Sequence, residues 1–456
     1  MPFDFFLFLT ILTAIVVLVS ILMAYRRSRD SFHPMIYMGL MLFYLYSYLP
    51  LSLFFQDADR LQTFLSVRQL EYIQGLNLLG VISICVGILI GDKGLRWSKL
   101  SKPKWVLPPI VEQRINRAAI ACGFIGVIAF AVGIINVGGI EAAYGGGYGG
   151  GWDDSGYIRE APLLTLPAML WFMTSHMRRK LTRFEWGLVF LFAIPQLMHG
   201  LLGARRGPTA MILVAIVMGW YLIRFRRPPL PIVVTGSVLL GLLLLFLVSN
   251  RGNIYLGSEF NFEGTQSYAT EVGSSNEFIY GGGVILNTDK KDIYLWGRRY
   301  FTIFFIRPIP RALWPSKYED ASTILAIPNL EKNLGTGTDT FSETLGWAGA
   351  VGAAPGIVAD MWIEFWWYYC IVLFIIGWFY GMAWRKAVSK GGLWIPVYTL
   401  MTSLSVYLVM QTLEAMSFRF LLTATASWLI WRYGISGKRK RINSYAHNFA
   451  NRNTRH

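Results

Sequence analysis

Two neighbouring arginines, Arg205 and Arg206, are the strongest candidates for chemistry in this chain. They lie in residues 203–208, where two glycines permit a tight turn and Pro208 suits the first position of a following helix. Guanidinium groups and the N–H groups of a helix N-terminus both favour phosphate, so the segment predicts a phosphate site. The alternative is that both side chains only reach out to lipid headgroups.

A second basic stretch lies between Asp292 and Glu319, where the chain has five cations and no acid. The expected partner is anionic, either a substrate or the surface of a membrane. Arg307 and Arg311 flank prolines and should be held most rigidly, which favours them for substrate contact. The five cations are Arg298, Arg299, Arg307, Arg311 and Lys317.

Carboxylates that follow this stretch are candidates for a catalytic base. Asp360 and Glu364 are four residues apart, as are Asp339 and Glu343, so each pair would share one face of a helix. A carboxylate beside arginines either forms a structural ion pair or accepts a proton from a hydroxyl group. We predict Asp360 as the leading candidate base, ahead of Glu343 and Asp339.

Three further polar residues lie near the ends of apolar segments. Glu414 and Arg419 stand on either side of the start of the last apolar segment, and they add one acid and one cation to the candidates. His199 precedes Arg205 by about one and a half helical turns. A single histidine there is expected to form a hydrogen bond between helices rather than act as a base.

The elements that must position these residues are membrane helices. The chain has 456 residues, 54% of them hydrophobic, and the apolar residues fall in blocks of about 20, the length that crosses a bilayer. We therefore predict an all-α polytopic integral membrane protein with about eleven transmembrane helices. Their approximate ranges are 5–25, 35–55, 72–91, 118–137, 161–175, 186–202, 208–223, 230–249, 365–384, 393–410 and 418–431.

The positive charges predict the orientation of these helices. Arg26, Arg27 and Arg29 follow the first span, which places the N-terminus outside, and no basic region precedes that span as in a signal peptide. The inside segments then hold 27 of the 42 Lys and Arg residues but only 4 of the 26 acids. The net charge of +16 therefore indicates topology and not nucleic-acid binding, and the basic tail 435–456 faces the cytoplasm.

The prediction is a single membrane domain over 1–456 with two external insertions. Residues 138–160 form a glycine-rich loop, in which Tyr148 and Trp152 are placed to bind sugars unless the loop is a plain connector. Residues 250–364 form a large loop whose stretch 293–314 should lie as a helix on the outer leaflet. Trp314, at the end of this stretch, is the third predicted sugar-binding aromatic residue.

The sequence shows none of the motifs of a metal, redox or nucleotide-driven site. Its three cysteines, Cys85, Cys122 and Cys370, have no paired spacing, and neither a P-loop nor a His-Glu-x-x-His motif is present. We expect no cofactor, so an energised substrate would have to carry its own driving force.

Three segments together resemble the bacterial repeat-unit polymerases of the Wzy type, which include the enterobacterial common antigen polymerase. These are Gly-Ala-Arg-Arg-Gly-Pro at 203–208, Ile-Pro-Arg-Ala-Leu-Trp-Pro-Ser-Lys at 309–317 and Ala-Pro-Gly-Ile-Val-Ala-Asp at 354–360. The number of spans and the large loop before the last three spans also match. The family often has a glutamate where this chain has Asp360.

The resemblance implies a glycosyltransferase with a GT-C-like architecture at the periplasmic face of the bacterial inner membrane. Such an enzyme joins oligosaccharide repeat units carried on undecaprenyl diphosphate during surface-polysaccharide synthesis, with no metal required. A chain-length regulator and a flippase are the implied protein partners. The residues implied to bind the diphosphate are Arg205, Arg206, Arg307, Arg311, Lys317 and Arg419.

Three other functions would use the same cations. A flippase or another transporter of lipid-linked oligosaccharides should show repeated halves with charges at mid-membrane, and this chain shows no such repeat. An O-antigen ligase differs from a polymerase mainly in the acceptor, and a non-catalytic export component is the third alternative. The product that a deletion strain fails to make would separate these functions.

Overall fold

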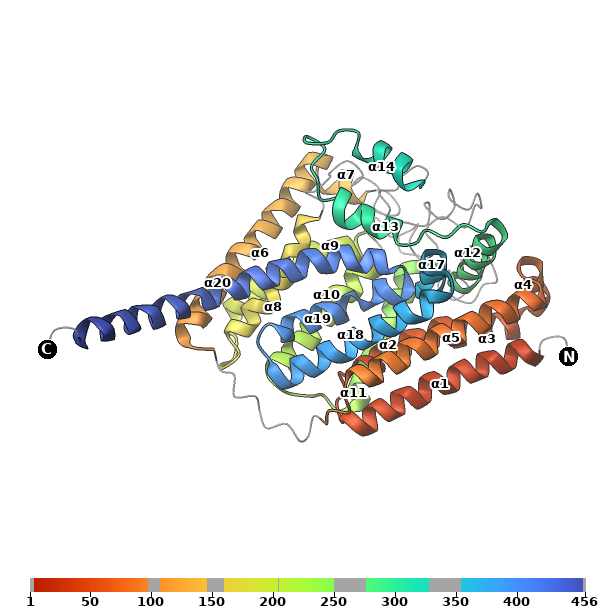
Figure 1. The fold of residues 1–456 in the computed structure, drawn as a ribbon, viewed down its shortest axis with the longest axis horizontal. Coiled ribbons are helices and arrows are strands. Elements are labelled where there is room, and N and C mark those ends of the chain that lie inside the picture. Colours follow the sequence, from red (N-terminus) through yellow and green to blue (C-terminus); the bar gives the residue numbers. More distant parts are fainter. Residues whose placement is uncertain are drawn as a thin grey trace.

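The computed structural model describes residues 4–96, 107–145, 160–203, 205–249, 276–327 and 354–453, with the side chains of the last helix placed as far as Ser436. These residues form helices and contain no strand (Figure 1). In chain order the elements are α1 (Asp4–Ser28), α2 (Pro34–Phe43), η1 (Tyr44–Tyr48), α3 (Leu49–Gln56), α4 (Ala58–Phe64), α5 (Val67–Gly91), α6 (Pro109–Val137), α7 (Ile140–Tyr144), η5 (Ala161–Leu164), α8 (Thr165–Ser175), α9 (Arg183–Leu201), α10 (Arg206–Ile223), α11 (Leu230–Ser249), α12 (Glu277–Lys291), α13 (Arg298–Phe301), η6 (Thr302–Ile306), α14 (Lys317–Leu325), α17 (Gly356–Phe365), η7 (Trp366–Tyr368), α18 (Tyr369–Lys390), α19 (Trp394–Met410) and α20 (Leu413–Asn453).

The helices confirm the prediction of an all-α membrane protein. In the described part of the chain, seven helical stretches are long and apolar enough to cross a bilayer, and three more are apolar but shorter. Each segment predicted as a span overlaps one of the helices, because apolar blocks in lipid must satisfy their backbone hydrogen bonds internally. The seven are Asp4–Ser28, Pro34–Gln56, Val67–Gly91, Pro109–Val137, Arg183–Leu201, Arg206–Ile223 and Gly356–Lys390, and the shorter ones are Ala161–Ser175, Leu230–Leu244 and Trp394–Met410.

Helices α5 and α18 pack backbone against backbone through glycines. A Cβ atom added to Gly377 would lie 3.0 Å from the backbone nitrogen of Ile88, and one added to Gly91 would lie 3.0 Å from that of Met382. The added Cβ atoms would also overlap the backbone carbonyl oxygens of Ile84 and Trp378, respectively, so larger side chains at these positions would push the helices apart. Small residues at such a contact are typical of helix pairs in membranes.

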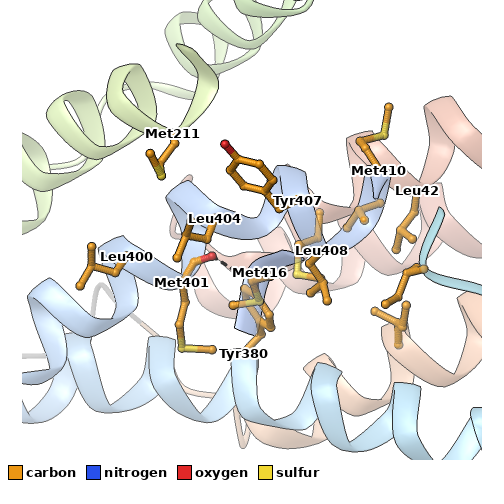
Figure 2. Packing of buried hydrophobic residues seen from close by; sticks show 14 of the residues in the cluster. Leu42, Met211, Tyr380, Leu400, Met401, Leu404, Tyr407, Leu408, Met410 and Met416 are labelled. Carbon is orange, nitrogen blue, oxygen red and sulfur yellow. Dashed lines mark hydrogen bonds between the residues drawn. The ribbon is translucent and has the colours of Figure 1, made fainter. Parts of the chain in front are cut away.

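A second packing centre joins α10, α19 and α20. Figure 2 shows Tyr407 of α19 pointing toward α10, on the side where Met211 lies. On the other side of α19, the Tyr380 hydroxyl of α18 donates to the carbonyl of Met401 at 3.0 Å, beside Met416 of α20. Tyr407 therefore stands at the junction of α10 and α19.

Helices α12, α13 and α14 lie toward the upper right edge of the molecule in Figure 1, and α12 packs against α17 and α5. The stretch 293–314, predicted as one surface helix, is helical only over α13 and the π-helical turn η6. It ends there because Pro308 and Pro310 have no N–H to continue the helix. The N–H of Leu295 also donates to the carbonyl of Ile363 at 2.8 Å, which fastens the segment to α17.

An ion pair ties three segments together at the far end of α18 from α17. The Arg227 guanidinium donates to both oxygens of Asp30, at 2.5 and 2.9 Å, and the indole N–H of Trp384 donates to one of them at 2.9 Å. Asp30 is fully buried, so its charge depends on these donors. The contact joins the α1–α2 and α10–α11 connections to α18.

Candidate functional site

Arg205 and Arg206 stand where α9 turns into α10. The backbone of Arg205 is extended, with φ −105° and ψ 111°, and its N–H donates to the carbonyl of Gly200 at 2.9 Å. Helix α10 begins at Arg206, two residues before the predicted start. Pro208 therefore lies within the first turn, where its missing N–H leaves no helical bond unmade.

Tyr407 marks the point at which Arg205 and Arg419 approach each other. Gly207 stands against its ring, since a Cβ atom at that position would overlap the ring. The guanidinium carbon of Arg419 lies 4.4 Å from the ring centre, a cation–π contact. The charges of Arg419, Arg205 and Glu160 all act on the Tyr407 hydroxyl. Arg205 from the α9–α10 connection and Arg419 from the second turn of α20 therefore both lie close to Tyr407.

Arg307, which directly follows η6, joins this location. Its Nη2 donates to Oε1 of Glu160 at 3.0 Å, and its guanidinium carbon lies 4.0 Å from the ring centre of Phe418. Phe418 directly precedes Arg419, and Glu160 is the acid whose charge also acts on Tyr407. We call Arg205, Arg307 and Arg419 the arginine cluster.

Arg419 is held without a carboxylate. Among the residues that the structure describes, it forms no ion pair, and its Nη1 donates to the carbonyl of Ala415 at 2.6 Å. It also lies against the face of Tyr407 and interacts with the hydroxyl of that residue. Carbonyl and ring contacts leave the positive charge uncompensated, so this guanidinium can still form a charge-assisted pair with an anion.

Arg206 faces a different element. Its Nη1 donates to Oε1 of Glu277 at 2.5 Å, which ties α10 to the first turn of α12. Both side chains are mostly buried, at 19% and 15% exposure. The two arginines predicted as one pair are therefore divided, with Arg205 close to Tyr407 and Arg206 bound to α12.

Lys317 is buried, and its ammonium group donates hydrogen bonds to the backbone. Its Nζ donates to the carbonyl oxygens of Ile306 at 3.3 Å, Arg307 at 3.0 Å and Ile309. Burial lowers the pKa of Lys317, and the charges of Arg311 and Arg307 lower it further. Because these carbonyls follow η6, Lys317 closes the end of that turn and fixes the backbone from which Arg307 projects.

Arg311 and Trp314 make their described contacts on the side of α14. The guanidinium carbon of Arg311 lies 5.5 Å from the ring centre of Tyr318. The indole N–H of Trp314 donates to Oδ2 of Asp320 at 2.6 Å, and Ser316 donates to the same oxygen at 2.8 Å. These contacts give the connection between η6 and α14 a defined shape.

Arg299 is fully buried among three buried carboxylates. It donates through Nη2 to Asp360 at 2.5 Å, through Nε to Glu364, and through Nη1 to Glu414 at 3.3 Å. Asp360 and Glu364 face it from one side of α17, as their four-residue spacing predicts, and Glu414 approaches from the start of α20. Burial alone would lower the pKa of Arg299, but the three carboxylates raise it well above its ordinary value. We call these four residues the Arg299 cluster.

Asp360, the leading candidate base, uses both carboxylate oxygens inside the protein. Oδ1 accepts from Arg299, and Oδ2 accepts from the Leu413 N–H at 2.8 Å and the Tyr300 hydroxyl at 3.3 Å. Glu364 is occupied in the same way, because its Oε2 accepts from the Gly297 N–H at 2.8 Å. In this arrangement Asp360 ties α13 and α17 to the start of α20.

Glu414 differs from the other two carboxylates. Its Oε2 makes the longest contact with Arg299, and its Oε1 is buried without a hydrogen-bond partner among the described residues. Burial and the charges of Asp360 and Glu364 together raise the pKa of Glu414 to about 8, although the charges of Arg299 and Arg307 act to lower it. This carboxyl group is therefore the one in the cluster that is least suited to carry a negative charge.

Four of the predicted site residues lie outside the described residues: Asp339, Glu343, Tyr148 and Trp152. His199 is described, and its Nδ1 lies 3.2 Å from the hydroxyl of Tyr144 at the end of α7. This is the hydrogen bond between helices that its position predicts. The charge of Arg205 also acts on Tyr144, so His199 lies near the arginine cluster.

The burial of Arg299 was not predicted from the sequence. Arg298 and Arg299 read as equivalent neighbours in a basic stretch, yet Arg298 donates to the carbonyls of Leu295, Tyr294 and Leu325 while Arg299 meets three acids. The available signal was the spacing of Asp360 and Glu364, which calls for a cation on the same face of the helix.

The described residues contain no group of three or more His, Cys, Asp and Glu side chains arranged to hold a metal ion.

Compared with known proteins, the chain matches no family model, no curated protein and no solved structure. The geometry and the sequence pattern are therefore the basis for a functional assignment.

Proposed function

We propose that this chain is a membrane glycosyltransferase that polymerises oligosaccharide repeat units carried on undecaprenyl diphosphate. In this proposal the growing chain leaves its carrier lipid for a sugar hydroxyl of the next repeat unit. The reaction belongs to surface-polysaccharide synthesis, such as that of O-antigen or exopolysaccharide. The resemblance of residues 203–208, 309–317 and 354–360 to Wzy-type polymerases supports the choice of substrate.

The observation that carries the proposal is the approach of Arg205 and Arg419 to Tyr407, with Arg307 linked to the same place through Glu160 and Phe418. The three arginines come from three separate parts of the chain, and Arg419 carries no ion pair within the described residues. Guanidinium groups bind phosphate through two parallel N–H donors, and several of them stabilise a diphosphate whose charge grows as it departs. Each of the three is therefore proposed to contact the leaving diphosphate.

The other residues predicted to bind the diphosphate or the sugars have structural or sugar-binding roles in this proposal. Arg206, Arg311 and Lys317 shape the connections that carry the cluster, through Glu277, Tyr318 and the carbonyls after η6. Aromatic side chains are proposed to hold sugars by stacking on their rings; they are Tyr148, Trp152 and Trp314.

A carboxylate is proposed to accept the proton of the attacking hydroxyl. Asp360 can do so only by giving up one of its internal donors, since both of its oxygens are occupied. Asp339 and Glu343 keep their place as candidates and lie outside the described residues. Asp360 is better supported as the residue that holds Arg299 and the start of α20 in place.

The proposal includes a topology of eleven spans with a GT-C-like architecture in the bacterial inner membrane. The N-terminus faces the periplasm and the C-terminus the cytoplasm, as the distribution of Lys and Arg favours. The arginine cluster then lies at the periplasmic face. A chain-length regulator and a flippase are the proposed protein partners.

A reconstituted reaction tests this function. Purified protein in nanodiscs is supplied with one defined repeat unit on undecaprenyl diphosphate, and the length of the product is measured. We expect polymer from the wild type and from Arg68→Ala, an exposed arginine at the start of α5. Polymer should be lost by a factor of about 100 or more in Arg205→Ala and Arg419→Ala, because each removes stabilisation of the leaving group.

The same reaction separates the alternatives. Polymer at wild-type levels from both variants contradicts the site assignment. Transfer of the oligosaccharide to a lipid A acceptor, without polymer, indicates a ligase. Movement of the lipid-linked unit across the bilayer without any new glycosidic bond indicates a flippase.

A further inference from the structure

Glu414 belongs to the Arg299 cluster and is also coupled to the arginine cluster. It shares Arg299 with Asp360 and Glu364, and the charge of Arg307 in the arginine cluster also acts on it. It also stands at the start of α20, one turn before Phe418 and Arg419. A change in the charge of Glu414 therefore changes the electrostatic interactions in both the Arg299 cluster and the arginine cluster.

The three carboxylates of the Arg299 cluster are not equally stable as anions. Asp360 and Glu364 each accept hydrogen bonds on both oxygens, and an ionised carboxylate requires such donors when it is buried. Glu414 has one long contact with Arg299 and one buried oxygen without a partner in the described structure. One guanidinium also cannot neutralise three negative charges. The neutral, protonated form of Glu414 therefore suits this place best.

Loss of that proton would create a buried anion with a strong demand for a donor. Arg299 is already bound by Asp360 and Glu364, so the next cation whose charge acts on Glu414 is Arg307. Arg307 is also one of the groups proposed to hold the diphosphate. A charged Glu414 and a bound anion would compete for it.

We propose that Glu414 is a positioning residue that holds a proton in the resting protein and, once deprotonated, draws Arg307 away from an anion bound at the arginine cluster. This inference rests on the proposed function, because it assumes that the cluster binds a diphosphate. The charged and titratable groups that face Glu414 are Arg299 and Tyr300 of α13, Asp360 and Glu364 of α17, and Arg307 after η6. Burial raises the pKa of Glu414 to about 8, so Glu414 loses its proton within the pH range in which binding can be measured.

Binding of inorganic pyrophosphate between pH 6.5 and 9.5 tests the inference. The dissociation constant is measured for the full-length wild type and for Glu414→Gln, which keeps the shape of the protonated carboxyl group but cannot ionise. Because pyrophosphate itself titrates in this range, the ratio of the two dissociation constants is taken at each pH. Glu319→Gln, a change at an exposed acid of α14, is the matched control.

We expect a ratio near one at pH 6.5 that rises to about tenfold weaker binding by the wild type at pH 9.5, in line with the loss of one charge-assisted contact. Glu319→Gln should follow the wild type at every pH. A ratio that stays constant across this range overturns the inference and leaves the proposed function standing. Absence of pyrophosphate binding by both proteins at every pH overturns the proposed function as well.

A merely structural role of Glu414 would weaken binding equally at all pH values and so give a constant ratio. If Glu414→Gln does not yield a monodisperse protein, Glu414→Met replaces it, since methionine has a similar volume and requires no hydrogen-bond partner. The same rise of the ratio with pH is expected for that variant.

Discussion

Replacement of Arg299 by methionine should be one of the most destabilising single changes in this chain. The side chain is fully buried and binds Asp360 and Glu364, with Glu414 as a third, longer contact. Methionine would leave two buried carboxylates without their cation. Removing one partner of a buried ion pair costs about 3–5 kcal/mol, so we expect a loss of at least about 3 kcal/mol.

The assay is the free energy of unfolding of the purified protein in detergent micelles, measured with increasing denaturant. Arg298→Met is the neighbouring control, because Arg298 donates to three backbone carbonyls and leaves no buried charge behind. Its loss should be clearly smaller than that of Arg299→Met. Arg68→Met, at an exposed site, should change stability by no more than about 0.5 kcal/mol.

Double-mutant cycles then test which of the carboxyl groups around Arg299 is ionised. Arg299 should couple strongly with Glu364→Gln and only weakly with Glu414→Gln, since Glu414 is inferred to be neutral. The reasoning would be refuted if Arg299→Met behaved like Arg68→Met. It would equally be refuted if the coupling with Glu414 were the larger of the two.

Two further changes probe the packing and the arginine cluster. Gly377→Leu should destabilise the protein by about 1–3 kcal/mol or prevent its accumulation in the membrane, because α18 meets the backbone of α5 at Ile88. Gly75→Ala, on α5 with open space around it, is the control and should be neutral or slightly stabilising in the same unfolding assay. Glu160→Gln should tighten pyrophosphate binding by about fivefold, the equivalent of about 1 kcal/mol, because it frees Arg307 from a competing carboxylate. Unchanged or weaker binding in a titration by calorimetry would contradict that competition.

The membrane helices could be predicted because their cause is local. Blocks of about 20 apolar residues must form helices in lipid, and the segments at 5–25 and 118–137 lie within the longer helices α1 and α6. The span predicted at 365–384 corresponds to α18, and the separate helix α17 precedes it across a break at Trp366, where φ is 50°. Asp360 and Glu364 are buried in α17 beside Arg299, which lies 61 and 65 residues earlier in the chain, and the local sequence does not indicate this contact.

In the candidate site too, features that depend on one element could be predicted, and contacts between distant segments could not. The position of Arg205 in a turn and the shared face of Asp360 and Glu364 follow from spacing within one element, and both agree with the structure. The separation of Arg206 from Arg205, by contrast, depends on Glu277 of α12. Contacts between segments that are far apart in the sequence determine where each of these arginines lies, and no local sequence pattern predicts such contacts.

The most direct test of the central claim is a structure of the protein in a lipid nanodisc with undecaprenyl diphosphate bound. The account predicts diphosphate oxygens within about 3 Å of the guanidinium nitrogens of Arg205, Arg307 and Arg419, beside Tyr407. A diphosphate bound at another place, with these three side chains turned toward lipid or internal acids, would contradict it.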